Sequence, residues 1–225
     1  MRNSQQYNRM VRYFVEAARS IIDTEGEEAV TARKVADAAG YNVATLYHYF
    51  ENLDHLLFFT SLRHLKDYAL DLPEYTKGVY DPIQLYLMTW ECFNQHAFRL
   101  PQIYARLFLP EYQTKYNHSL RFYYEIFPEE LPKNGLRFFP MFQQGGLYER
   151  DYVLLIDAAR RGLLRKEDVA DISIMNTMIF KGMINKFLGS SPRPSIEQAM
   201  RDTMRYQSRT LIGFGVSREY VKDYL

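Results

Sequence analysis

The chain of 225 residues carries 28 lysine and arginine side chains against 27 carboxylates, and it contains a single cysteine. One cysteine excludes an intrachain disulfide and a cluster of thiolate metal ligands, and the near-neutral charge does not by itself indicate a nucleic-acid-binding protein. The polar N-terminus lacks the apolar core of a secretion signal, and no apolar run reaches the roughly 18 residues that span a bilayer. We therefore expect a cytoplasmic protein without membrane contact.

The first predicted element is a helix over residues 4–25, in which apolar side chains recur at steps of three and four residues until Gly26 ends it. Glycine and proline number only 11 and 9 along the whole chain, which favours an all-α fold. Basic side chains gather near the start of this helix, at Arg2, Arg9 and Arg12. This local distribution is more informative than the net charge, because a short DNA-binding motif needs few basic contacts.

Residues 31–50, TARKVADAAGYNVATLYHYF, predict a helix-turn-helix. Thr31 is suited to cap the first helix, Gly40 to end it in the left-handed conformation, and Asn42 to cap the second. Leu46 gives the second helix an apolar side, and its other face carries methyl, hydroxyl and aromatic groups suited to base edges and phosphates. The residues predicted to contact DNA are Thr31, Arg33, Asn42, Val43, Ala44, Thr45, Tyr47, His48 and Tyr49.

The same stretch resembles the signature of TetR/AcrR-type regulators, T-x-R-x-I-A-x-x-A-G-V-S-x-x-T-L-Y-x-Y-F, and the resemblance extends from Tyr7 to about Leu70. Two positions depart from the family pattern. Leu53 stands where members usually have a lysine that binds a phosphate, and Tyr41 stands where they usually have valine. The first departure bears on DNA affinity and the second on packing at the turn.

The resemblance implies a helix-turn-helix DNA-binding domain over residues 1–52 and a helical ligand-binding and dimerisation domain over residues 53–225. It further implies a homodimer that binds double-stranded operator DNA, with repression relieved by a small molecule as the family default. No cofactor is expected.

Beyond the motif, the periodicity predicts a helix over residues 53–70, and the stretch 72–81, with its proline and glycine, is the best candidate for a domain boundary. Residues 128–146 are rich in proline and glycine and predict a long loop. The other predicted helices cover residues 82–97, 101–110, 111–127, 147–161, 168–188 and 195–213.

Aromatic side chains are concentrated in the predicted helices that follow residue 82. For any single ring, packing in the core is the commoner role. Collectively, however, so many tyrosine hydroxyls need polar partners, and a ring-lined cavity suits a small apolar or aromatic effector. The predicted effector-binding residues are Trp90, Phe93, His96, Tyr104, Phe108 and Tyr123.

Stripes of methionine and other apolar residues mark the last two predicted helices. They could pack inside the monomer or form a four-helix interface between two copies, and the family resemblance favours the interface. The predicted interface residues are Met175, Ile179, Met183, Met200, Met204 and Leu211.

The sequence contains no His-Glu-x-x-His, no Gly-x-Ser-x-Gly and no complete dinucleotide fingerprint, and its five histidines lack ligand spacing. We therefore expect neither an enzyme nor a metal site. The alternative to a regulator is a helical adaptor that binds another protein through the loop FPEELPKNGLRFFPMF and keeps a weakened DNA-binding head. Leu53 and the lack of basic residues from Asn42 to Phe50 keep this alternative open.

Overall fold

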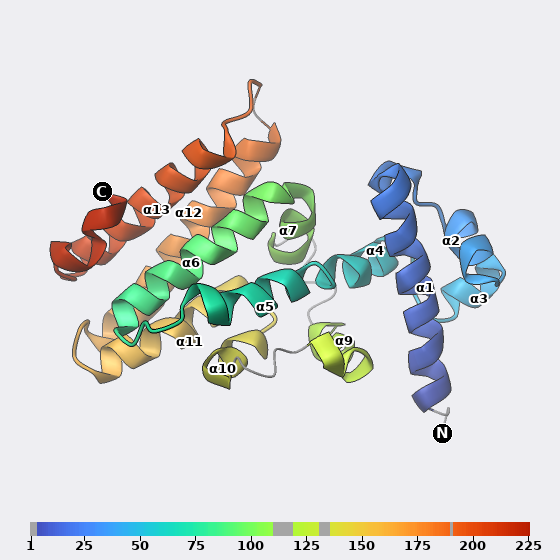
Figure 1. Ribbon diagram of the computed structural model, residues 1–225, viewed down its shortest axis with the longest axis horizontal. Helices are drawn as coiled ribbons and strands as arrows, with labels where there is room; N and C mark the ends of the chain where they lie inside the picture. Colours follow the sequence, from blue (N-terminus) through green and yellow to red (C-terminus); the bar gives the residue numbers. More distant parts are fainter. Residues whose placement is uncertain (1–3, 110–118, 131–135, 190) are drawn as a thin grey trace. The chain divides into compact units, whose positions relative to one another are not determined.

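The computed structural model describes residues 4–109, 119–130, 136–189 and 191–225. Within these ranges every regular element is a helix (Figure 1), which confirms the predicted all-α fold. The chain divides into two compact units: Met1–Lys66 with Thr114–Leu131, and Asp67–Gln113 with Pro132–Leu225. The first unit thus extends beyond residue 52 and includes a segment from the middle of the chain.

The elements of the first unit are α1 (Ser4–Glu25), η1 (Glu27–Ala29), α2 (Ala32–Ala39), α3 (Val43–Tyr47), α4 (Leu53–Leu62), α9 (Ser119–Ile126) and η2 (Pro128–Glu130), where η marks a 3₁₀ helix. Helix α1 buries a stripe that includes Val11, Phe14 and Ala18, because residues three and four apart share one face of a helix. Helix α4 packs against both α1 and α9 and is buried from Leu56 to Leu62. Burying a side chain such as Phe14 contributes roughly 1.5–3 kcal/mol.

The helix predicted over residues 53–70 is interrupted. Helix α4 ends at Leu62, Arg63 and His64 lie in a turn, and the next helix begins at Leu65. The apolar spacing continues through this stretch, so the sequence carries no local signal for the interruption. The chain between the two units is therefore not one continuous helix.

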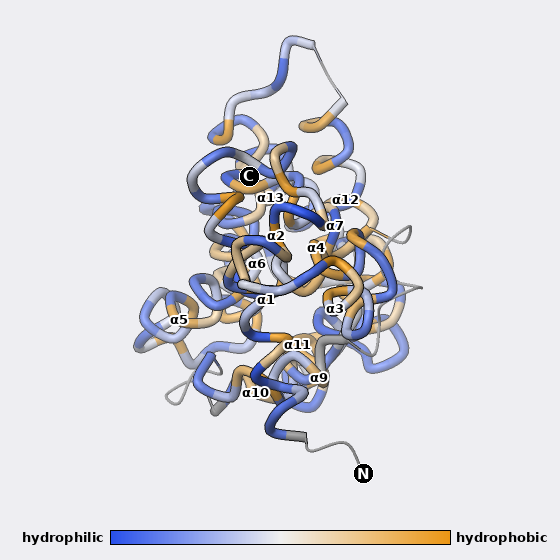
Figure 2. Tube along the Cα trace, turned by 90° about the vertical axis from the view of Figure 1, so that its right-hand side faces the viewer, coloured by the Kyte–Doolittle hydropathy of each residue, from blue (hydrophilic) through white to orange (hydrophobic). Residues whose placement is uncertain are grey.

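The elements of the second unit are α5 (Leu65–Tyr75), which begins at the unit boundary, α6 (Pro82–Arg99), α7 (Pro101–Phe108), η3 (Leu136–Phe138), α10 (Phe139–Phe142), α11 (Leu147–Arg160), η4 (Lys166–Asp168), α12 (Val169–Gly189), α13 (Ile196–Gly213) and η5 (Arg218–Tyr224). Helix α12 packs against α11 and α13, and α6 packs against the same two helices. Both hydrophobic and hydrophilic residues occur along α12 and α13 (Figure 2), and the buried residues of α13 include Ala199, Met204 and Leu211.

Two predictions for the middle of the chain need adjustment. The helix predicted over residues 111–127 is described only from Ser119, as α9, while Tyr112 and Tyr116 lie outside the described residues. The stretch 128–146 contains η2, η3 and α10 rather than a structureless loop, and its residues 131–135 are likewise outside the description. The apolar side chains buried in this stretch are Phe138, Met141 and Phe142, so they are not available to an external partner.

Among the described residues, no helix is both long and apolar enough to cross a membrane. Within the same ranges, no group of three His, Cys, Asp or Glu side chains is placed to hold a metal ion.

Candidate DNA-binding and effector-binding sites

The two helices of the helix-turn-helix are defined by their caps. The Thr31 hydroxyl accepts a hydrogen bond from the Lys34 N–H at 3.2 Å at the start of α2, and the Asn42 side chain accepts from the Thr45 N–H at 2.8 Å at the start of α3. Gly40 ends α2 with φ +78°, a left-handed conformation that a residue with a Cβ adopts at a cost of about 1 kcal/mol. These are the caps that the sequence predicts.

The first unit presents one face of α3 to solvent. Leu46 is fully buried and fixes the rotation of the helix, so that Ala44, Tyr47 and His48 are exposed, Tyr47 to 47%. Of the remaining predicted DNA contacts, Thr31, Arg33 and Asn42 are exposed, while Val43, Thr45 and Tyr49 are half-buried.

Tyr49 is set apart from this exposed face by its packing. Its ring centroid lies 5.0 Å from that of Tyr7 and 6.0 Å from that of Phe14, both on α1. Tyr41, which replaces the usual valine of the family, also packs on α1: its ring lies 5.7 Å from Phe14 and stacks at 6.5 Å on Tyr13. Both tyrosines therefore help to attach the motif to α1.

The basic side chains near the motif differ in how far they are neutralised. Arg33 is highly exposed and lies 3.9 Å from Asp37, whereas Lys34 pairs with Glu25 at 2.5 Å. Arg12, one of the basic residues at the start of α1, pairs with Glu129 at 2.7 Å. Arg12 is therefore paired with a carboxylate inside the first unit, a contact that no local sequence pattern predicts.

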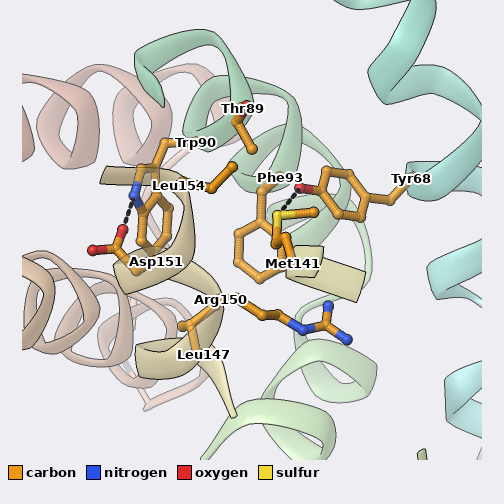
Figure 3. A pocket seen from close by; sticks show the side chains of 9 residues that line it. All are labelled: Tyr68, Thr89, Trp90, Phe93, Met141, Leu147, Arg150, Asp151 and Leu154. Carbon is orange, nitrogen blue, oxygen red and sulfur yellow. Dashed lines mark hydrogen bonds between the residues drawn. The ribbon is translucent and has the colours of Figure 1, made fainter. Parts of the chain in front are cut away.

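The second unit contains a small cavity between α5, α6, α10 and α11 (Figure 3). Its volume is about 20 Å³, which is room for about one water molecule. Rings and aliphatic side chains form most of the wall. The lining residues are Tyr68, Thr89, Trp90, Phe93, Met141, Leu147, Arg150, Asp151 and Leu154.

The six residues predicted to bind an effector lie in three different environments. Trp90 and Phe93 line the cavity, and the rings of Tyr104 and Phe108 pack on Phe93, each with a centroid distance of 5.3 Å. The remaining two residues are His96 and Tyr123, which do not line this cavity.

His96 packs edge-on against Tyr68, which does line the cavity, and its Nε2 lies 3.1 Å from the Asp71 carboxylate. Burial lowers the pKa of His96, and Asp71 acts in the opposite direction. Tyr123 belongs to the first unit, where its hydroxyl donates to Glu130 at 2.5 Å. Its hydroxyl therefore has a partner within that unit, which its place in a predicted aromatic helix does not indicate.

Asp151 of α11 is a buried carboxyl beside the cavity. Its Oδ1 accepts hydrogen bonds from Trp90 Nε1 at 2.5 Å and from the Tyr86 hydroxyl at 2.8 Å (Figure 3 shows the first). Asn176 Nδ2 donates to the Tyr86 oxygen at 2.6 Å. Burial raises the pKa of Asp151 from 3.8 to about 7, and its hydrogen bonds act in the opposite direction.

Asp151 is not among the predicted site residues, although the sequence carries a signal for it. Leu147, Asp151 and Leu155 follow one another at four-residue steps, so the acid lies on the apolar stripe of a predicted helix. A carboxyl at such a position is buried and needs hydrogen-bond donors from other helices.

An exposed apolar face runs along α12. Ile174, Met175 and Met178 are exposed to 41%, 44% and 65%, and Tyr206 of α13 is also exposed. Of the predicted interface residues, Met175 is therefore exposed, Ile179 and Met200 are half-buried, and Met183, Met204 and Leu211 are buried within the chain. Met204 and Leu211 pack inside the chain because α13 is covered by α6 as well as by α12, and Met183 lies on α12, which packs against α11 and α13.

Comparison with known proteins connects these features to a family. The family model described as "Bacterial regulatory proteins, tetR family" matches residues 14–58, which include α2 and α3. A search of the curated proteins finds no match.

Solved structures share the fold along nearly the whole chain. RolR in complex with resorcinol is 14% identical, with 99% of this chain and 95% of that chain covered and a TM-score of 0.56. RolR without ligand is 13% identical, with 94% of both chains covered and a TM-score of 0.60. Thermus thermophilus FadR, a repressor in complex with lauroyl-CoA, is 14% identical, with 92% and 96% covered and a TM-score of 0.61. The match to the tetR family model thus covers the helix-turn-helix and parts of the helices on either side of it, and the fold shared with these structures covers most of the chain.

Proposed function

We propose that the protein is a dimeric transcriptional repressor that binds operator DNA through α3 and releases it when a small apolar or aromatic effector binds the second unit. The observation that carries the proposal is the exposed face of α3, formed by Ala44, Tyr47 and His48 on a helix that Asn42 caps. Hydroxyl and imidazole groups suit phosphates and base edges, and methyl groups suit the thymine methyl.

The proposal includes a dimer because one short helix contacts few base pairs. Two heads about 34–36 Å apart reach successive major grooves on one side of the DNA. The exposed apolar face that Ile174, Met175 and Met178 form on α12 is a surface suited to a second copy of the chain. Its composition is that of an interface core, with apolar side chains at its centre.

The effector class follows from the cavity wall and from two relatives. RolR is solved with resorcinol and T. thermophilus FadR with lauroyl-CoA, which are an aromatic and an acyl compound. The wall formed by Trp90, Phe93 and Met141 suits either kind of group. Ligand pockets usually measure about 300–1,000 Å³, so the cavity of about 20 Å³ must open on binding. The effector would therefore favour a conformation with an open cavity over the present one. A ligand can release the protein from DNA only by favouring one of two conformations in this way.

Removing side chains of α3 that are predicted to contact DNA, the exposed Tyr47 and the half-buried Thr45, is expected to weaken operator binding. Tyr47→Ala and Thr45→Ala should each cost about 1–3 kcal/mol of binding free energy, because contacts with DNA are lost while Leu46 still holds the helix. Fluorescence anisotropy with DNA from upstream of the chain's own gene measures the effect. Tyr80→Ala removes a more exposed tyrosine, on the second unit, and should leave binding unchanged. Wild-type affinity in both α3 variants would contradict the proposal.

An effector should stabilise the folded protein. At about 100 times its dissociation constant, a ligand that binds only the folded state adds about 2.7 kcal/mol. We expect a compound from the phenol or the acyl-CoA class, tested first as resorcinol and lauroyl-CoA, to raise the melting temperature and alter the emission of Trp90, the only tryptophan. Phe93→Trp should narrow the cavity and reduce the thermal shift, whereas Phe214→Trp, away from the cavity wall, should not. The absence of any shift with both classes would contradict the effector assignment.

A further inference from the structure

The cavity between α5, α6, α10 and α11 has aromatic rings in its wall that meet nearly at right angles (Figure 3). The ring centroids of Trp90 and Phe93 lie 5.6 Å apart with an interplanar angle of 90°, and those of Tyr68 and Phe93 lie 5.4 Å apart at 78°. Rings at such angles form adjacent sides of a box. Because the face of an aromatic ring is electronegative, a box of this kind is suited to an organic ammonium group.

The aromatic surround of the cavity already holds one cation of the protein. The guanidinium carbon of Arg150 lies 5.2 Å from the ring centroid of Phe108, and that ring packs on Phe93. Arg150 and Asp151 are neighbours in the sequence, but their side chains extend in opposite directions from α11 (Figure 3). The positive charge of Arg150 therefore lies away from the part of the wall that Asp151 forms with Trp90.

Asp151 contributes a carboxyl group to the cavity wall and is only 1% exposed. The groups that face this carboxyl are Trp90 and Tyr86 of α6 and Ser173 of α12, and each is a hydrogen-bond donor without charge. Within the part of the chain that the structure describes, Asp151 forms no ion pair. Burial raises its pKa to about 7. A cation that enters the cavity therefore meets a carboxyl that is able to ionise and that has no cationic partner of its own.

We propose that the effector is an organic cation, an amine with an aromatic or apolar body, and that Asp151 is the residue that determines this specificity. The inference rests on the proposed function, because it names the chemical class of the effector that the cavity takes. The rings attract the ammonium group, and the carboxylate supplies the opposite charge. In surroundings of low dielectric constant that charge acts across the cavity without direct contact.

The structural role of Asp151 is compatible with this assignment. Trp90 and Tyr86 both donate to Oδ1, and hydrogen bonds to a carboxylate stabilise its ionised form. Asp151 can therefore hold α6 and carry a negative charge at the same time. An anionic effector would be repelled by this charge and would have to bind near Arg150 instead.

The test compares three probes of nearly the same shape, benzylamine, benzyl alcohol and benzoate. Between pH 6 and 8 they are a cation, a neutral compound and an anion. Small probes are used because the cavity, with a volume of about 20 Å³, has to open for any ligand. Each probe is titrated into the full chain at pH 6, 7 and 8, and binding is followed by the emission of Trp90, the only tryptophan.

Benzylamine should bind about tenfold more tightly than benzyl alcohol at pH 7, and benzoate should bind most weakly. The affinity for benzylamine should rise about tenfold from pH 6 to pH 8, because the cation needs the ionised carboxyl, whose pKa without ligand is about 7. At pH 6 each bound benzylamine should release nearly one proton, measured in a pH-stat, and benzyl alcohol should release none. Proton release distinguishes a carboxyl that ionises on binding from one that only supports the wall.

Asp151→Asn should abolish the preference for benzylamine, its pH dependence and the proton release. Asp157→Asn removes a surface carboxylate of the same helix and should retain all three. Proton release is measured on the wild-type protein, so it decides the matter even where Asp151→Asn does not fold.

Tighter binding of benzoate would point to Arg150 and overturn the inference. Equal binding of the three probes, or a preference that survives Asp151→Asn, would overturn it as well. The inference also fails if none of the three probes binds. The proposed function, by contrast, loses its effector only if resorcinol and lauroyl-CoA produce no thermal shift either.

Discussion

Substitution of Met175 by glutamate is expected to dissociate the proposed dimer at a cost of several kcal/mol, because two copies of the new carboxylate would be buried without partners near a two-fold axis. Met175 is exposed to 44% in the single chain. The folded monomer should therefore tolerate the charge, so that the loss falls on association alone. Met178→Glu, at a position exposed to 65% on the same face, should act in the same way.

Sedimentation equilibrium over a range of micromolar concentrations measures the effect. Leu70→Glu is the matched control, since it places the same charge at a leucine of α5 that is exposed to 49%. The control should sediment as the wild type does. A wild-type protein that is monomeric at these concentrations, or a Met175→Glu variant that remains dimeric, would show that this face of α12 does not join two copies.

The helix-turn-helix was predictable because its determinants are local. Thr31 and Asn42 cap helices within three residues of themselves, and Gly40 adopts its left-handed φ at the position where the helix ends. Helical periodicity then places Leu46 inside and Tyr47 outside. None of these inferences depends on how distant parts of the chain meet.

The features that could not be predicted depend on distant contacts. Arg12 and Glu129 are separated by 117 positions, and no local pattern indicates that the segment around Glu129 packs on α1. The same reason explains why the sequence could not tell which residues of the predicted dimer interface are buried within the chain. An apolar face on α13 has the same pattern whether it meets another chain or α6, and Met204 and Leu211 are buried inside the monomer. Sequence periodicity predicts that a face is covered but not which surface covers it.

Asp151 shows that a polar residue within an apolar stripe can be more informative than the stripe itself. Along α11 an apolar stripe is interrupted by a single carboxyl, and its partners Trp90 and Tyr86 come from α6. The carboxyl within the apolar stripe is already visible in the sequence. Only the structure shows that the donors surround it and that burial dominates its ionisation.

The buried carboxyl leads to the last expected result, a loss of stability with rising pH that Asp151→Asn removes. The pKa of Asp151 is raised from 3.8 to about 7 by burial, so the folded protein holds this proton more tightly than the unfolded chain does. The contribution of the protonated Asp151 to the free energy of unfolding is therefore fully present below about pH 4, and it is lost as the pH rises through about 7. The difference between the two pKa values corresponds to about 4 kcal/mol as an upper figure, because local relaxation and water entry reduce it.

Urea unfolding at a fixed protein concentration, followed by circular dichroism from pH 4.5 to 8, measures this dependence. The fixed concentration keeps any contribution from dimer association constant. Asp151→Asn keeps the shape of the side chain and one oxygen that accepts from Trp90 and Tyr86. The free energy of unfolding of this variant should therefore lack the part of the wild-type decline with pH that Asp151 causes. Asp157→Asn removes a carboxylate that pairs with Arg161 at the surface of the same helix, and it should retain the wild-type decline. Parallel stability profiles for wild type and Asp151→Asn would show that the carboxyl ionises in the folded protein as freely as in the unfolded chain. The hydrogen bond from Trp90 Nε1 would then hold a charged group without measurable cost.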